Sequence, residues 1–505
     1  MGKQMWLKNG DRNTKFFHRA ASQRKKANEI QNIKREDGSV ACSREDIFDI
    51  FNRHYKSLFS TSQLDKIADC LKYVEKRVDE HMNRHLTREF TAEEVRTTLF
   101  QTNPLGSPGL DGFSAIFFQK HWDIVGEDVT KAVLEAFNAE GDMSCNNETY
   151  ILLILKLVSK VIANRLKLIL HQIISPTQSA FVLGRLILDN VIVAFEAMHS
   201  MSTKVKGQQG FMSLKLDMIE VLSSLLQQAE DSRLIHGIQL GRGRLSINHL
   251  FFADDSLLFC RVSAVEWAKI IELLELYESG SRQKLNKEKT SIYFSANTKI
   301  MTRDHILGMA GFRATLSYEK YLGLLALLGR SRIQAFKGIL DRVRSRVSNL
   351  KNKLLSQTGK EVLLKAIIQA LPTYCMGVFK LSKSLLRELN RIMHNYWWGQ
   401  QQGERKTHWV SWQQMGKAKN DGGVGFKNFE SFNYALLAKQ AWRILQVHHS
   451  LASQVLRAKY FPKIDFLKAK VGVRPFFIWM SICSARHLIE RGTISRIGNG
   501  HNKLI

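Results

Sequence analysis

The stretch LFFADDSLLF, residues 250–259, places two adjacent carboxylates between two apolar runs. Neither run alternates polar and apolar residues, which is typical of strands buried on both faces of a sheet. We therefore predict a β-hairpin with Asp254 and Asp255 at its tip. An ordinary surface turn is the alternative, since Asp is common in turns. However, like charges near an apolar core repel unless a cation neutralises them, which favours Mg²⁺ or Mn²⁺ at this tip.

The composition indicates a partner of negative charge. The 505 residues include 74 Lys and Arg against 46 Asp and Glu, and residues 330–505 alone hold 31 basic and 8 acidic residues. Such a basic field favours nucleic acid, with anionic membrane as the alternative. No apolar run reaches the roughly 20 residues of a membrane span, so no membrane is expected. The six scattered cysteines form no CxxC pair, which is typical of an intracellular protein of the nucleus or cytoplasm.

A second acidic strand is predicted at Phe211–Met218, where Asp217 follows an apolar run. Ligand-binding residues of sheets commonly lie at such C-terminal strand ends. With Asp254 and Asp255 it would form a trio of carboxylates able to hold two metal ions about 4 Å apart. In-line phosphoryl transfer uses this arrangement, because one metal activates the attacking hydroxyl and the other stabilises the leaving oxygen.

Apolar residues at helical spacing predict helices at Ile47–Phe59, Phe113–Val125, Leu157–Ile174 and Leu186–Met201. A basic helix is predicted at Arg330–Leu350. One of its faces holds Ile333, Phe336, Leu340, Val343, Val347 and Leu350, and its other faces hold Arg332, Lys337, Arg342, Arg344 and Arg346. Such a helix suits contact with the backbone of a duplex, and a solvated helix face is the alternative.

In this order, these residues resemble the reverse transcriptases of plant non-LTR (LINE-type) retrotransposons. Phe252–Asp255 looks like the family's aromatic-Ala-Asp-Asp box, and Lys215–Met218 looks like the strand with the first catalytic aspartate. Further segments that resemble the family are Trp6–His18, Pro104–Gly112, Gln178–Phe181, Gly184–Arg185, Ser279–Thr290, Tyr321–Leu324, Trp397–Gly399 and Gly422–Phe426. Their joint order makes the resemblance specific.

The resemblance implies an α+β fold, the right-hand polymerase, with fingers, a palm holding a small antiparallel sheet, and a helical thumb. The chain is accordingly divided into 1–85, an N-terminal basic helical region; 86–215, fingers; 216–328, palm; 329–400, thumb; and 401–505, a basic C-terminal region. We expect this last region to end before the zinc and ribonuclease H segments that follow in relatives.

The implied activity is RNA-directed DNA polymerisation, with RNA template, DNA primer or target, and deoxynucleoside triphosphates as partners. Asp217, Asp254 and Asp255 would bind two Mg²⁺ or Mn²⁺ while the primer 3′-hydroxyl attacks the α-phosphate. The resemblance makes Lys289 a proton donor to pyrophosphate. It also makes Arg185 and Gly323 nucleic-acid contacts.

The sequence departs from the family in three places. Met218–Ser223 lacks the expected aromatic residue, no Gly-Asp-Pro occurs between Asp217 and Asp254, and Tyr150–Lys156 runs into Leu157 without a fingers strand. We therefore expect incomplete fingers and palm and an impaired enzyme. A missing palm helix would leave apolar sheet surface exposed to water. The alternative functions are a non-catalytic nucleic-acid-binding remnant or a pseudogene product.

Overall fold

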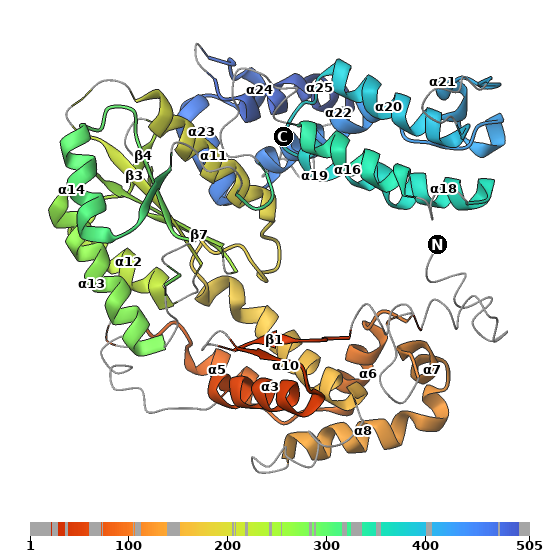
Figure 1. The fold of residues 1–505 in the computed structure, drawn as a ribbon, viewed down its shortest axis with the longest axis horizontal. Coiled ribbons are helices and arrows are strands. Elements are labelled where there is room, and N and C mark those ends of the chain that lie inside the picture. The colour runs from red at the N-terminus through yellow and green to blue at the C-terminus, as the bar shows by residue number, and fades with distance from the viewer. Residues whose placement is uncertain are drawn as a thin grey trace, which may run out of the picture.

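The computed structural model contains three groups of elements in chain order. Among the described residues, those between 33 and 173 are mostly helical, those between 211 and 315 hold the largest sheet, and those between 337 and 492 are mostly helical. The sheet lies at one side, with the N-terminal helices below it and the C-terminal helices above it (Figure 1). The structure describes residues 22, 29–35, 39–59, 72, 74–104, 106, 113–138, 152–204, 207, 209–217, 221–241, 245–253, 255–281, 285–286, 289–315, 321–324, 336–349, 355–399, 407–472 and 475–493.

The largest sheet has five strands in the order β6-β7-β3-β8-β9. Its strands are β3 (Phe211–Asp217), β6 (His249–Phe252), β7 (Asp255–Arg261), β8 (Ser291–Phe294) and β9 (Arg313–Thr315). β3 pairs antiparallel with β7 and β8, and β6 and β7 form the predicted hairpin. β8 and β9 run parallel, so the sheet is mixed at this edge rather than antiparallel throughout. A separate hairpin joins β4 (Ile238–Leu240) and β5 (Leu245–Ile247).

Helices cover both faces of this sheet. Phe211 and Leu257 enter one apolar core with α11 (Ile187–Thr203) and the C-terminal helices. Leu216 and Leu258, at positions of the opposite face, enter a second core. The helices of the second core are α12 (Val221–Asp231), α13 (Ala264–Ser281) and α14 (Ile300–Ala310). Burial on both faces confirms the interpretation of the unalternated apolar runs. Within the described residues, the core closes over this sheet in spite of the short interval after Asp217.

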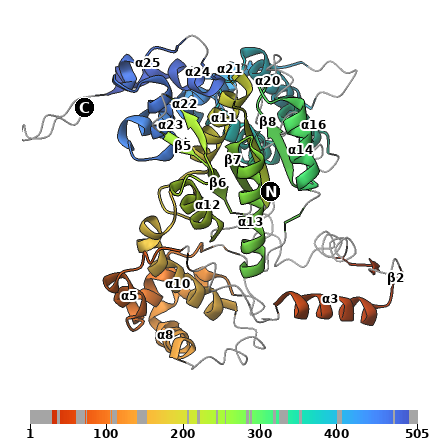
Figure 2. The same cartoon turned by 90° about the vertical axis from the view of Figure 1, so that its left-hand side faces the viewer.

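The N-terminal elements are β1 (Ile33–Lys34), β2 (Val40–Ala41), α3 (Arg44–Phe59), α5 (Glu80–Thr87), α6 (Ala92–Phe100), α7 (Ala115–Lys120), α8 (Trp122–Asn138) and α10 (Leu152–Ile173). α6, α8 and α10 share a small core around Val95, Val133 and Leu157. α10 is continuous across Lys156 and Leu157, where a fingers strand would be expected. α3 overlaps α5 in Figure 1 but lies apart from it in Figure 2, and Phe48 of α3 is 65% exposed.

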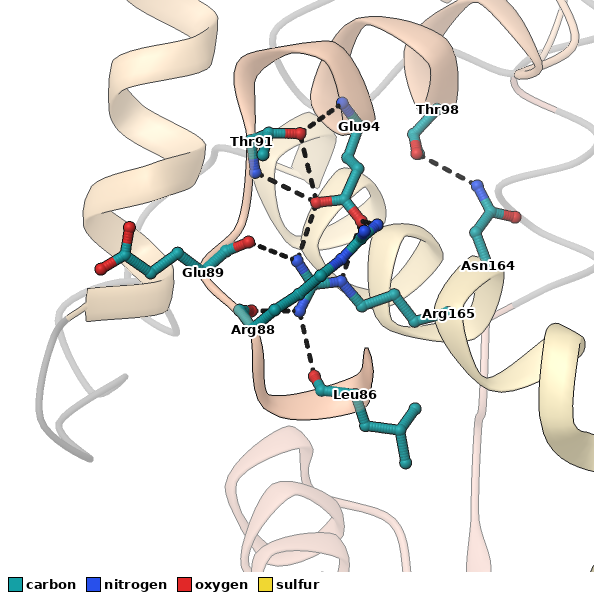
Figure 3. A network of polar contacts seen from close by, with 8 residues as sticks. All are labelled: Leu86, Arg88, Glu89, Thr91, Glu94, Thr98, Asn164 and Arg165. Atoms are coloured by element: carbon teal, nitrogen blue, oxygen red, sulfur yellow. Dashed lines mark hydrogen bonds and ion pairs between the residues drawn. The ribbon is translucent and has the colours of Figure 1, made fainter. Parts of the chain in front are cut away.

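A buried arginine holds the N-terminal helices together (Figure 3). Arg165 of α10 is 4% exposed, and its guanidinium donates two hydrogen bonds to the Glu94 carboxylate. Three more go to the carbonyls of Leu86, Arg88 and Glu89. The guanidinium also lies 3.7 Å from the centroid of the Phe90 ring. All five N–H donors of Arg165 are therefore used, which fixes α10 against α6 and the loop before it.

The C-terminal helices form one body across the expected boundary at residue 400. They are α16 (Lys337–Ser348), α18 (Gln357–Ala366), η2 (Ile368–Ala370), α19 (Thr373–Met376), α20 (Lys383–Trp397), α21 (Trp412–Met415), η3 (Lys419–Asp421), α22 (Phe429–Gln446), α23 (Leu451–Tyr460), η4 (Phe466–Lys468), α24 (Phe477–Ser484) and α25 (Arg486–Gly492). A single core contains Val343, Met393, Phe429 and Trp479. The described residues 407–472 and 475–492 therefore pack as part of the same body as the helices before them.

Two ion pairs fasten α11 to these C-terminal helices. The Asp189 carboxylate accepts two hydrogen bonds from the Arg443 guanidinium, at 2.9 and 3.0 Å. The Glu196 side chain, which is fully buried, accepts from Lys459 at 2.7 Å and from the Tyr460 hydroxyl at 2.8 Å. α11 thus lies between the sheet and the C-terminal helices as a shared central element (Figure 1).

Several helix predictions are confirmed with shifted bounds. α3, α10 and α11 match the predicted helices at 47–59, 157–174 and 186–201. The predicted helix at 113–125 is broken at His121, between α7 and α8. Within the described residues, no helix is long and apolar enough to cross a membrane. The family-like segment Trp6–His18 lies outside the described residues.

Candidate active site

The acidic hairpin turns one residue earlier than predicted. Phe252 pairs with Asp255 across the hairpin, so Asp255 belongs to the second strand and the chain leaves the first strand at Ala253. Ala253 has a φ of +50°, the left-handed conformation that such tight hairpin turns require. Asp255 is therefore the first residue of β7 and not part of the tip. Asp254 lies outside the described residues.

Two of the predicted acidic positions face each other across neighbouring strands. Asp217, the last residue of β3, is the Cα partner of Asp255. For Asp217 only the backbone is described. Directly opposite residues of an antiparallel pair stand on the same face of a sheet, about 5 Å apart. The register therefore brings these two positions together at one end of β3 and β7.

Lys215 is an additional charged neighbour of Asp255. Its Nζ lies 3.2 Å from the Asp255 carboxylate, with 30% and 38% of the two side chains exposed. Lys215 stands two residues before Asp217, so both positions share a face of β3. Lys215 is not among the site residues predicted from the sequence. The period-two pattern of Lys215–Asp217 is the signal that could have placed it beside the acids.

A tight turn with one buried and one half-buried tyrosine lies next to this end of the sheet. Tyr321 and Leu324 exchange two backbone hydrogen bonds, and Leu322 and Gly323 have φ values of +48° and +77°. The Tyr374 hydroxyl donates to the carbonyl of Leu322 at 3.0 Å. The pKa values of both phenols are raised, mainly by burial and also by the negative charge of Asp255. The structure thus brings the Gly323 turn near Asp255.

The segment Ser175–Arg185 runs beside the outer strand of the hairpin. Gln178 forms a parallel bridge with Phe251, and the Ser179 N–H donates to the Phe251 carbonyl. The same carbonyl accepts from the side-chain amide of Asn190 at 2.6 Å. Phe181, with a φ of +62°, is 87% exposed. A bulky residue in this conformation is an outlier that costs energy, and it leaves an aromatic ring in solvent close to the hairpin.

Arg185, which was predicted to contact nucleic acid, is bonded to the backbone of its own chain. Its guanidinium donates hydrogen bonds to the carbonyls of Ile174, Ser175 and Gln178. These contacts hold the segment against the C-terminal end of α10. Burial lowers the pKa of Arg185. Its contact with nucleic acid stays a prediction.

The predicted basic helix is α16, which begins at Lys337. Its buried residues are Ile339, Leu340 and Val343, and its described cations, Lys337, Arg342, Arg344 and Arg346, are all exposed. Arg344 pairs with Glu388 at 2.8 Å. The expected separation of an apolar and a cationic surface is confirmed for these residues. Arg332 and the other residues of 325–335 lie outside the described residues.

Lys289 is exposed in the turn before β8, where its backbone N–H donates to Asn286. Within the described residues, no contact joins it to Asp255, so its role as a proton donor stays a prediction.

A buried histidine connects the hairpin to two neighbouring segments of the chain. His249, the first residue of β6, is fully buried. Its Nε2 lies 2.6 Å from the Thr177 hydroxyl and 2.7 Å from the Ser223 hydroxyl. Burial lowers its pKa to about 3, so the imidazole is neutral at pH 7. It links the segment before Arg185, the hairpin and α12.

The donor set near the hairpin suits a hard divalent cation. Carboxylate oxygens are the ligands that Mg²⁺ and Mn²⁺ prefer, and the paired positions Asp217 and Asp255 supply two carboxylates. Within the described residues, no group of three or more His, Cys, Asp or Glu could hold a metal ion. Two of the three predicted ligands, Asp254 and the side chain of Asp217, fall outside that description.

Comparison with known proteins finds three relatives and no matching family model. An uncharacterized mitochondrial protein of Arabidopsis thaliana is 44% identical over 137 residues, which are 27% of this chain and 89% of that protein. A protein of the same plant, provisionally named as a ribonuclease H protein, is 37% identical over 25% of this chain and 20% of its own length. An uncharacterized 149 kDa protein of the transposon TX1 of Xenopus laevis is 31% identical over 37% of this chain and 16% of its own length.

Proposed function

This chain belongs to the same family as the uncharacterized mitochondrial protein of Arabidopsis thaliana and is related to a transposon protein, and from that premise we propose that it is an RNA-directed DNA polymerase of a LINE-type retroelement. The observation that carries the proposal is the register of the acidic strands. Asp217 and Asp255 are direct cross-strand partners beside an acidic hairpin turn. A right-hand polymerase palm needs its carboxylates together in this way.

The proposed site holds two Mg²⁺ or Mn²⁺ on Asp217, Asp254 and Asp255. When bound, the metals lower the pKa of the primer hydroxyl and stabilise the leaving pyrophosphate oxygen. The chain's own residues position these acids. The two strands fix the backbone of Asp217 opposite that of Asp255, and the Lys215 ammonium neutralises part of the charge of Asp255. The buried Tyr321 and the half-buried Tyr374 pack the turn 321–324 beside Asp255.

Two further surfaces of the chain suit nucleic acid. The exposed cations of α16 would contact phosphates of an RNA–DNA duplex. Exposed Phe181 offers a ring on which a base could stack. Both surfaces are independent of the carboxylates, so binding and catalysis can be separated by substitution.

A second candidate function is nucleic-acid binding without catalysis. The ion pair of Lys215 with Asp255 supports it, because a lysine that neutralises the carboxylate competes with a metal ion for the same oxygens. In that case the basic surfaces would still bind RNA, and the acids would serve only the fold.

One pair of assays separates the two candidates. Purified protein is incubated with poly(rA)/oligo(dT), Mg²⁺ and dTTP, and RNA retardation is measured at low salt on the same samples. For the polymerase, incorporation falls to the level of a protein-free blank in Asp255→Asn and is unchanged in Asp304→Asn, an exposed acid of α14. RNA retardation with no incorporation by the unmodified chain supports the second candidate. Absence of both activities refutes both.

A further inference from the structure

A cavity of about 680 Å³ lies at the opposite end of the sheet from the acids. It is lined by the C-terminal end of α11, the first residues of β3, the β4 strand, the end of β7 and α23. Ligand sites commonly have volumes of about 300–1,000 Å³. Arg261 lies six residues beyond Asp255 on β7, which is about 20 Å along the strand. This cavity is therefore separate from the candidate active site.

The cavity wall is rich in positive charge. Lys204, Arg261 and Lys459 line it, together with His199. Lys459 is neutralised by Glu196 at 2.7 Å. Within the described part of the chain, neither Lys204 nor Arg261 forms an ion pair with a carboxylate. The sequence segments that follow Lys204 and Gly241, residues 205–208 and 242–244, contain no acidic residue either.

Lys204 and Arg261 lie close enough to repel each other. The pKa of Lys204 is lowered, first by burial and then by the charge of Arg261. The ammonium of Lys204 lies 4.1 Å from the centroid of the Phe211 ring, which holds it at the wall. A cation at the last turn of a helix is explained by the helix dipole, and this accounts for Lys204 at the end of α11. It does not account for Arg261, which ends a strand. The Glu266 carboxylate accepts a hydrogen bond from the backbone N–H of Arg261 at 3.2 Å and forms no ion pair with its guanidinium. Two neighbouring cations whose side chains form no ion pair within the described residues favour an anionic ligand.

His199 is the fourth titratable side chain of the cavity wall. The buried Nδ1 of His199 has no hydrogen-bond partner among the described residues. Burial and the charge of Lys459 lower the pKa of His199 to about 4, so its ring is neutral at pH 7 and adds no charge to the cavity wall.

The cavity depends on the C-terminal helices. Gly241, which follows β4, has a φ of +73°, and a Cβ there would lie 2.3 Å from the Ala458 carbonyl oxygen of α23. Only glycine permits this approach, which places Lys459 at the cavity wall beside α11. The wall is thus assembled from two distant parts of the chain.

We propose that this cavity binds a phosphate group, held by Lys204 and Arg261. The group comes either from a small phosphorylated compound or from a nucleic-acid backbone, and the chemistry of recognition is the same in both. The planar guanidinium of Arg261 can donate hydrogen bonds to two phosphate oxygens at once, and the ammonium of Lys204 adds a second positive charge. The proposal does not rest on polymerase activity.

The test is the affinity for inorganic pyrophosphate by isothermal titration calorimetry. The full chain is compared with the double variant Lys204→Met and Arg261→Met, which keeps the apolar stems of both side chains. A matched control, Lys439→Met with Lys470→Met, removes two exposed cations elsewhere. Thermal unfolding without pyrophosphate shows whether each variant folds, and Arg261→Lys provides a conservative single variant for the same titration.

We expect the Kd for pyrophosphate to rise at least tenfold in the double variant and to stay within twofold in the control. A second arm measures anisotropy of a labelled 20-nucleotide RNA. If the double variant also loses RNA affinity and pyrophosphate displaces the RNA, the phosphate belongs to a nucleic-acid backbone. If RNA affinity is unchanged while pyrophosphate affinity falls, it belongs to a small compound. Equal pyrophosphate affinity of the full chain and the folded double variant, or no binding by the full chain, overturns the proposal.

Discussion

Replacing Arg165 by Met is expected to release the N-terminal helices from one another. The substitution removes the five hydrogen bonds of the guanidinium and leaves Arg88 as the one cationic partner of the Glu94 carboxylate among the described residues. Breaking a buried ion pair from one side costs about 3–5 kcal/mol. Glu94 keeps 20% of its side chain in solvent and can partly rehydrate, so we expect the lower end of that range, about 3 kcal/mol.

Hydrogen exchange measured by mass spectrometry detects this loss of stability in the N-terminal helices. A loss of about 3 kcal/mol corresponds to a fall of roughly 150-fold in the protection of amides in α5, α6 and α10. Peptides from the sheet should not change. Arg88→Met is the matched control, because Arg88 is 52% exposed and makes one bond to the same carboxylate. A surface pair of this kind contributes about 0–1 kcal/mol.

The ion pair of Arg165 with Glu94 also makes the stability of these helices depend on pH. Hydrogen bonding to Arg165 lowers the pKa of Glu94 from 4.5 to about 2. Its stabilisation is therefore complete above pH 4.5 and is lost as the pH falls from 4.5 towards 2. Arg165→Met should flatten the pH dependence of protection in this window. A fall in protection of less than tenfold at pH 7, or an equal fall in Arg88→Met, would refute the reasoning.

Three further predictions concern the sheet and α11. Because the pKa of His249 is about 3 when folded and about 6.5 when unfolded, the unfolded chain binds more protons between these values. Lowering the pH from 7.5 to 5.5 should therefore cost about 1.3 kcal/mol in urea unfolding, and His249→Gln should remove that loss. Gly323→Ala places a side chain at a φ of +77° and should destabilise by about 1–2 kcal/mol in the same assay. The control is Gly338→Ala, inside α16 with open space around it, which should leave the free energy of unfolding unchanged or raise it. If both variants lose the same stability, the positive φ of Gly323 is not the cause of the loss. Asp189→Asn breaks the bidentate pair with Arg443 and should destabilise by about 3 kcal/mol, with α22 losing amide protection first. Unchanged protection of α22 would show that the pair does not hold this helix.

Local sequence patterns predict the helices and strands of this protein better than they predict which of these elements pack together. The apolar runs around Asp255 and before Asp217 predict two strands, because burial on both faces removes all alternation. The break at His121 was missed, since apolar spacing continues across it from Phe117 to Val125. The hairpin turn was misplaced by one residue, because Ala253 adopts a left-handed conformation that residue type does not reveal.

Contacts between distant segments could not be read from the sequence. Nothing local to Asp189 indicates a partner 254 positions later at Arg443. Arg165 likewise reads as a surface residue of a basic helix, although it is buried against Glu94. Such pairs depend on how three groups of elements meet in space. Periodicity within one helix carries no information about that.

The position of α11 has a consequence for the order of folding during synthesis. α11 is buried by α23, and their ion pair joins residues separated by 263 positions. At a translation rate of roughly 5–20 residues per second, α23 is made about 13–50 s after α11. Until then the apolar side of α11 that α23 covers, with its unpaired Glu196, stays exposed on a ribosome-bound chain. Contacts of such high sequence separation slow folding, and this interval is when the nascent chain most needs a chaperone.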